Sequence, residues 1–217
     1  MNPEVREDKL IFFGSNEMYK ILNYSKEYFI DITFRIIPKK SRPIKMMTVS
    51  SKDGNNNTII CLFVFYKYQD KITYDRIFNF LKENYNFIPK IVHHDYEYAL
   101  YSSLDNSKIF GEKILLAFCY FHFIKAIVDK MIKLKIQKGK LNKQAYEVIK
   151  NIEIISFIKQ TNLKNYIKFL IDNIEKLDNV SKFISYLKLN WFNKNPDLYN
   201  YEKILNLIKN DNKENEK

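Results

Sequence analysis

The sequence has few cysteines and no long hydrophobic run, and both shortages limit the class of protein. Cys61 and Cys119 are the only cysteines among 217 residues, which excludes a disulfide-stapled framework and fits a reducing compartment. No apolar stretch reaches the roughly 20 residues that a membrane-spanning helix needs. The first nine residues are polar and acidic, unlike a secretory signal. We therefore expect a soluble intracellular protein that does not bind membranes.

Arginine is also scarce, but lysine is not, and the chain carries an excess of positive charge. Lys and Arg number 36 against 25 Asp and Glu, which gives a formal net charge of +11. This excess favours a polyanionic partner such as DNA, because basic side chains that bind phosphates release counterions. The predominance of Lys, Asn and Ile also fits a biased codon usage, so charge alone does not establish nucleic-acid binding.

The order of the apolar segments predicts an α/β protein. Runs rich in β-branched and aromatic residues alternate with short helical patterns over residues 10–121. The first three strands suit a meander, whereas helices between the later strands imply parallel crossovers. This order is that of a mixed five-stranded, ribonuclease-H-like sheet with flanking helices. The predicted strands are 28–37, 46–50, 58–66, 91–92 and 114–121, and the predicted helices are 74–85 and 96–104.

The second half of the chain has an almost wholly helical pattern. Apolar residues recur at helical spacing at 123–131, 146–158, 163–177 and 180–191, and we interpret these stripes as core. The predicted parts are a lead-in over 1–26, a core over 27–135, a C-terminal all-helical segment over 136–207 and a disordered polar tail over 208–217.

Two aspartates are the candidates for chemistry. Asp31 interrupts an apolar strand on the face that Phe29, Thr33 and Arg35 share, where an unpaired charge is costly to bury. It is either a metal ligand or one half of a buried ion pair with Arg35 or a lysine. Asp95 follows an apolar strand, where α/β sheets gather ligands, although aspartate there also suits a helix N-cap. Carboxylates on adjacent strands would suit Mg²⁺ or Mn²⁺ and metal-assisted phosphodiester transfer.

Four motifs in order resemble the transposase domain of Mutator-like elements. Residues 31–34 read Asp-Ile-Thr-Phe, with Pro38 after them, against the family's D-G-T-F and Pro. Residues 95–100 match D-F-E-x-A-L, residues 119–123 match C-x-F-H-F, and residues 74–89 resemble a family helix and its following Pro. The resemblance covers about three-quarters of the chain, residues 9–174.

That family has a ribonuclease-H-like fold with an Asp, Asp, Glu triad. The resemblance therefore implies that Asp31 and Asp95 are catalytic metal ligands for DNA cleavage and strand transfer in the nucleus. Ile32 departs from the family because it replaces a glycine and crowds the backbone beside the first aspartate. The third acid of the family lies in T-N-N-x-x-E, and the best match here, residues 209–214, ends in Glu214 without a predicted helix to hold it.

The missing helix points to a truncated or degenerate copy of such a transposase. A DNA-binding remnant without catalysis remains an alternative, and so does a basic interaction module whose acids pair with lysines. Whether the protein forms a homo-oligomer and which DNA sequence it prefers stay open.

Cys119 and His122 form a C-x-x-H pair, which is half of a tetrahedral zinc site. Cys61, His93 and His94 lack the spacing for a second pair, so we do not expect zinc. We expect Cys119 to be a buried core thiol and His122 to orient an active-site or DNA phosphate group. His93 and His94 are expected to face solvent or to support the metal ligands from behind.

Overall fold

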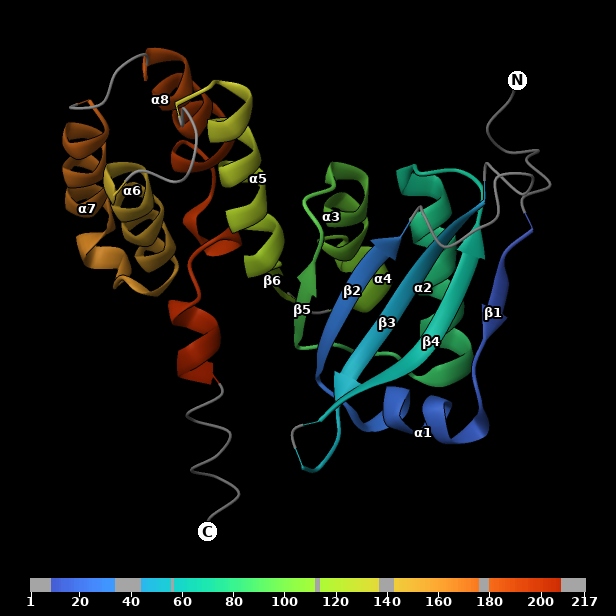
Figure 1. Ribbon diagram of the computed structural model, residues 1–217. Coiled ribbons are helices and arrows are strands. Elements are labelled where there is room, and N and C mark those ends of the chain that lie inside the picture. Colours follow the sequence, from blue (N-terminus) through green and yellow to red (C-terminus); the bar gives the residue numbers. More distant parts are fainter. Residues whose placement is uncertain are drawn as a thin grey trace, which may run out of the picture. The chain divides into compact units, whose positions relative to one another are not determined.

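The computed structural model describes residues 9–33, 44–55, 57–111, 114–136, 143–175 and 180–207 (Figure 1). The chain divides into two compact units, Met1–Leu116 and Ala117–Lys217. In the described part of the chain, no helix is long and apolar enough to cross a bilayer.

The chain forms a six-stranded mixed sheet with the order β1-β4-β3-β2-β5-β6, and strands β1 to β5 lie in the first unit. Strands β2, β3 and β4 form an antiparallel meander, β1 pairs antiparallel with β4, and β5 runs parallel to β2. The prediction of an α/β protein is therefore confirmed, but the predicted number of five strands is wrong by one edge strand. The strands are β1 (Ile11–Phe13), β2 (Glu27–Thr33), β3 (Lys45–Lys52), β4 (Thr58–Tyr66), β5 (Ile91–His94) and β6 (Leu115–Phe118).

The additional strand, β1, lies in the segment that was predicted to be a lead-in. It has only three residues, and two of them, Ile11 and Phe13, are more than half exposed, so it has no alternating pattern long enough to recognise. Helix α1 (Asn16–Tyr24) follows, and its N-cap residue Ser15 accepts a hydrogen bond from the backbone N–H of Met18. Leu22 of this helix is fully buried in the core of the first unit.

Strand β2 separates a core face from an outer face. Tyr28, Ile30 and Ile32 are buried in one cluster with side chains of α2 (Lys71–Tyr85), which lies behind the sheet in Figure 1. Phe29 is half-buried and Asp31 is exposed on the opposite face. The alternation of a strand thus places the Asp31 carboxylate on the face away from this helical core.

The helices of the first unit begin and end where local sequence signals favour it. Helix α2 begins after Asp70, whose carboxylate accepts the Thr73 N–H at 2.9 Å, and ends at Asn86 with φ +48°. Two shorter helices connect β5 to β6: α3 (Tyr98–Leu104) and α4 (Ser107–Phe110).

In the described part of the second unit, all regular elements after β6 are helices, as the apolar spacing predicts. Trp191, the single tryptophan, is buried and packs edge-on against Phe123 at 4.6 Å between ring centroids. Its elements are α5 (Tyr120–Lys133), α6 (Lys143–Ile154), η3 (Ile155–Phe157), α7 (Gln160–Ile174), α8 (Ser181–Leu187), the π-helical turn η4 (Lys188–Phe192), η5 (Pro196–Leu198) and a helix over 202–207.

Candidate metal centre

The two predicted aspartates lie side by side on neighbouring parallel strands. Asp31 belongs to β2, and Asp95 is the first residue after β5. The β2–β5 register pairs Ile30 with His94, so the chain brings the following residues of both strands together. One carboxylate oxygen of Asp31 lies within 4.8 Å of one carboxylate oxygen of Asp95. Two motifs that are far apart in the sequence thus meet at one end of these strands.

Asp95 is held in place by the backbone of β2. Its Oδ2 accepts a hydrogen bond from the Ile32 N–H at 2.9 Å. The N-cap of α3 is Glu97, so the N-cap explanation for Asp95 is wrong. The bond to Ile32 fixes the Asp95 carboxylate beside the strand that carries Asp31, and charge-assisted bonds of this kind are comparatively strong.

Asp31 is exposed, which rules out a buried ion pair as the reason for its position. The Thr33 hydroxyl donates a hydrogen bond of 2.9 Å to Asp31 Oδ2 and orients the carboxylate. Arg35, the partner considered for such a pair, lies outside the described residues. The Ile32 side chain, only 7% exposed, points into the core on the other face of the strand. The isoleucine therefore does not crowd the carboxylates, and only its N–H faces them.

The donor set of this pair fits a hard divalent cation. Carboxylate oxygens are the ligands that Mg²⁺ and Mn²⁺ prefer. Oxygens bound to one Mg²⁺ at about 2.1 Å lie up to about 4.2 Å apart, and the longer bonds of Ca²⁺ allow slightly more. A separation within 4.8 Å therefore needs little or no movement for both carboxylates to share one ion.

The pairing of Asp31 and Asp95 is an observation on this chain alone. No protein-family model matches the chain, and no curated protein matches it. A fold can host many activities, so what these aspartates do is inferred from their geometry and from the motifs around them.

Glu97 is a further acidic residue near this end of the sheet, beyond the two aspartates, and the sequence pattern predicted no role for it. Its Oε2 accepts a hydrogen bond of 2.5 Å from the Tyr74 hydroxyl, which lies 3.2 Å from the Tyr66 hydroxyl. Burial raises the pKa of both tyrosines well above the usual value, so both stay protonated and Tyr74 donates. Tyr74 belongs to α2, which is distant from Glu97 in the sequence. No local sequence pattern around Glu97 could therefore predict these hydrogen bonds.

The two histidines before Asp95 do not face solvent. His93 stacks on Phe29 with 4.6 Å between ring centroids, and its Nε2 lies 2.9 Å from Glu27 Oε1. His94 is fully buried, and its Nδ1 donates to the Asp95 carbonyl oxygen at 2.8 Å. His94 thus supports the backbone of the candidate ligand Asp95. Of the two alternatives expected for it, exposure to solvent or support of a ligand, the structure shows the second.

His94 makes the stability of the protein depend on pH. Burial lowers the pKa of His94 to about 4 from its usual 6.5, because the charged form loses its hydration. The unfolded chain therefore takes up a proton between about pH 6.5 and 4 while the folded chain does not. We expect the free energy of unfolding to fall by roughly 3 kcal/mol across this range on account of His94. Urea unfolding of wild type and His94→Gln at pH 7 and 4.5 measures the part of the pH dependence that is due to His94. An equal loss of unfolding free energy in both proteins would contradict this prediction.

The two cysteines are not part of the aspartate pair. Cys61 is buried in β4, and burial raises the pKa of its thiol to about 11. Cys119, at the N-cap of α5, is only partly buried, so the expectation of a buried core thiol is wrong. Among the described residues, no group of three metal-ligating side chains contains a cysteine. His122 lies in the first turn of α5, edge-on to Phe121, and its role stays a prediction. Glu214 lies outside the described residues.

Proposed function

We propose that the chain is a transposase-type nuclease domain with a ribonuclease-H-like fold, which uses Mg²⁺ or Mn²⁺ at Asp31 and Asp95 to cleave DNA and transfer strands. The observation that carries the proposal is the approach of these two carboxylates to within 4.8 Å. Both residues belong to motifs that resemble those of Mutator-like transposases. A chance pairing of unrelated surface acids would not be expected to fall on the two motif aspartates.

The sheet order supports the same proposal. Strands β2, β3 and β4 form a meander, and β5 is added in parallel on the β2 side after helix α2. The candidate ligands therefore lie on the first strand of the meander and directly after the first crossover strand. This mixed arrangement of antiparallel and parallel strands is compatible with a ribonuclease-H-like sheet and supports the proposal.

The residues of the site have separate tasks under this proposal. The Asp31 carboxylate is exposed, so a cation bound to it could also contact a substrate phosphate, and Thr33 orients the carboxylate. The Ile32 N–H holds Asp95 in place, which leaves less reorganisation for ion binding. A bound divalent ion would lower the pKa of a water or a 3′-hydroxyl and stabilise the leaving oxygen.

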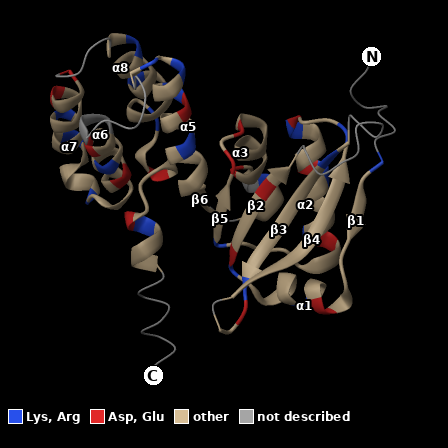
Figure 2. Cartoon of the chain, viewed as in Figure 1, with Lys and Arg blue, Asp and Glu red and all other residues tan. Residues whose placement is uncertain are grey.

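The positive charge is concentrated in the second unit. Residues 117–217 contain 19 of the 36 basic residues and 11 of the 25 acidic residues, so they carry +8 of the net +11. Figure 2 shows basic positions along the helices of this unit. We assign these lysines to contacts with the DNA phosphate backbone, which suits a nuclear protein.

A DNA-binding remnant without catalysis is the second candidate function. The second acid of the Asp95 motif, Glu97, favours this candidate. Its carboxylate accepts a hydrogen bond from Tyr74 and so is already engaged within the protein. Two carboxylates rarely suffice for a two-metal site, so the third acid decides between the two functions.

Incubation of the purified full chain with supercoiled plasmid separates these functions. The nuclease predicts nicked and linear products with Mg²⁺ or Mn²⁺ and none with EDTA. A shift of the plasmid in native gels without cleavage in either metal would leave the remnant as the function. Absence of both cleavage and binding would contradict both candidates.

A further inference from the structure

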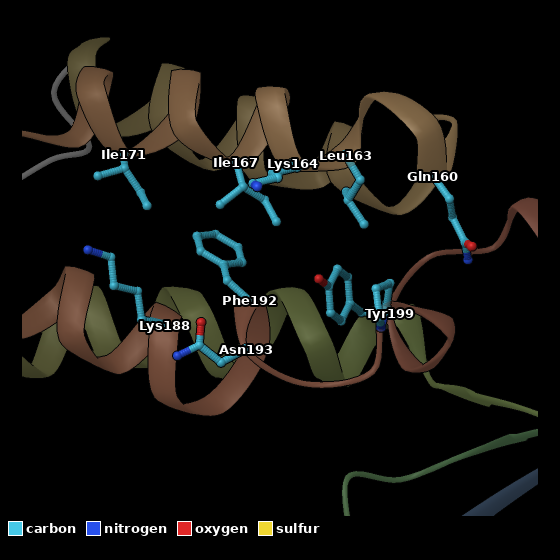
Figure 3. Close-up of a pocket in the computed structure, with 10 residues that line it drawn as sticks. Gln160, Leu163, Lys164, Ile167, Ile171, Lys188, Phe192, Asn193 and Tyr199 are labelled. Atoms are coloured by element: carbon cyan, nitrogen blue, oxygen red, sulfur yellow. The ribbon is translucent and has the colours of Figure 1, made fainter.

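The second unit contains a cavity that the proposed nuclease does not use. It has a volume of about 380 Å³ and lies between α7 and the segment that contains η4 and Tyr199 (Figure 3). Its apolar walls are Leu163, Ile167 and Ile171 on one side, and Phe192 and Pro196 on the other. Small-molecule sites typically have volumes of about 300–1,000 Å³ and mostly apolar walls with a few polar groups.

A buried hydroxyl at this cavity has no hydrogen-bond partner among the residues that the structure describes. Tyr199 is 1% exposed, and its hydroxyl makes no hydrogen bond within the described residues. Figure 3 shows the ring lining the cavity, with the hydroxyl pointing into the space between α7 and η4. Buried hydroxyls are nearly always hydrogen-bonded, so an oxygen acceptor on a ligand would satisfy this one. Burial raises the pKa of Tyr199 to about 12, which keeps the hydroxyl a donor.

Two lysines give the cavity a positive charge. Lys164 comes from α7 and Lys188 from the start of η4, so the two exposed lysines lie on opposite walls, Lys188 toward the Ile171 end (Figure 3). Neither lysine forms an ion pair with another described residue, and no described acidic side chain lines the cavity. The polar groups that line the cavity thus include two ammonium groups and one hydroxyl donor without a partner, but no carboxylate among the described residues.

We infer that this cavity binds a small amphipathic anion, a molecule with one oxyanion head and an apolar body. The head accepts a hydrogen bond from Tyr199, and Lys164 and Lys188 supply the positive charge along the cavity that favours an anion over a neutral ligand. The body packs between the aliphatic side chains of α7 and the ring of Phe192. The cavity lies wholly within the second unit, so this inference does not depend on Asp31 and Asp95.

Binding of 8-anilinonaphthalene-1-sulfonate to the folded full chain tests the inference. Trp191 is the only tryptophan and directly precedes Phe192 of the cavity wall, so excitation of Trp191 should produce emission from a dye bound there. We expect decanoate, but not the neutral decanol, to displace the dye. Dye bound without energy transfer from Trp191, or displaced equally by both competitors, would overturn the inference.

Matched variants test the polar groups. The double variant Lys164→Gln/Lys188→Gln should weaken dye binding about tenfold or more, and Tyr199→Phe, which keeps the ring, should weaken it several-fold. Lys168→Gln removes one charge from the same helix without altering the cavity and should bind as wild type does. Circular dichroism confirms that each variant is folded. Wild-type affinity in the folded double variant, or equal binding of the uncharged analogue N-phenyl-1-naphthylamine, would show that no anion site exists.

Discussion

Replacing either Asp31 or Asp95 by asparagine is expected to abolish divalent-dependent DNA cleavage, with a loss of at least about 100-fold. Residues that only support a metal ligand already cost 10–100-fold when they are changed, so loss of a ligand should cost more. Asparagine keeps the size of the side chain and one oxygen, so Asp95→Asn still accepts the Ile32 N–H. The fold should therefore persist while the negative charge that attracts the cation is halved.

Asp105→Asn is the matched control, because Asp105 is an exposed aspartate at the C-terminal end of α3. It should cleave as wild type does in the same plasmid assay. Thermal unfolding of all three variants distinguishes loss of the site from loss of the fold. Full cleavage by a folded Asp31→Asn or Asp95→Asn protein would rule out the assigned site.

DNA affinity is expected to fall about 10³-fold when the salt concentration rises from 50 to 200 mM. This is the change expected when about six phosphates are neutralised by basic side chains, because each contact releases condensed counterions. The +8 charge of residues 117–217 is sufficient for such a set of contacts. Fluorescence anisotropy of a labelled duplex over this range measures the dependence.

The same titration separates DNA binding from a basic interaction module. If the lysines serve mainly to pair with acids of the chain, as Lys71 does with Asp75 and Lys125 with Asp129, affinity for DNA should be weak at every salt concentration. A dissociation constant that hardly changes between 50 and 200 mM salt would show that lysine–phosphate contacts do not hold the DNA. Both the nuclease and the remnant require the steep dependence.

Much of the first unit could be predicted from the sequence because its signals are local. The apolar runs of β3 and β4 and the spacing of Ile77, Phe78 and Leu81 in α2 identify their elements. Crossover logic then predicts that the strand after α2 joins the sheet in parallel, and the structure pairs it with β2, which brings Asp31 and Asp95 together. These are inferences from periodicity and chain order, which a single sequence contains.

Contacts between distant side chains could not be predicted in this way. The bond from Ile32 N–H to Asp95 and the hydrogen bond between Tyr74 and Glu97 join different elements. Strand β1 was missed because three residues with exposed side chains lack a pattern. The burial of His94 could have been predicted from the sequence, because strand alternation places it on the same face as the apolar Val92.

If Asp31 and Asp95 share a divalent cation, the backbone amide of Ile32 should report its binding directly. This N–H is hydrogen-bonded to Asp95 Oδ2 at 2.9 Å, so a paramagnetic ion bound by the pair would lie close to it. Titration of the ¹⁵N-labelled chain with Mn²⁺ should broaden the Ile32 resonance among the first, and Asp31→Asn should prevent this. An Ile32 resonance that stays sharp in wild type, or broadens equally in Asp31→Asn, would contradict the claim.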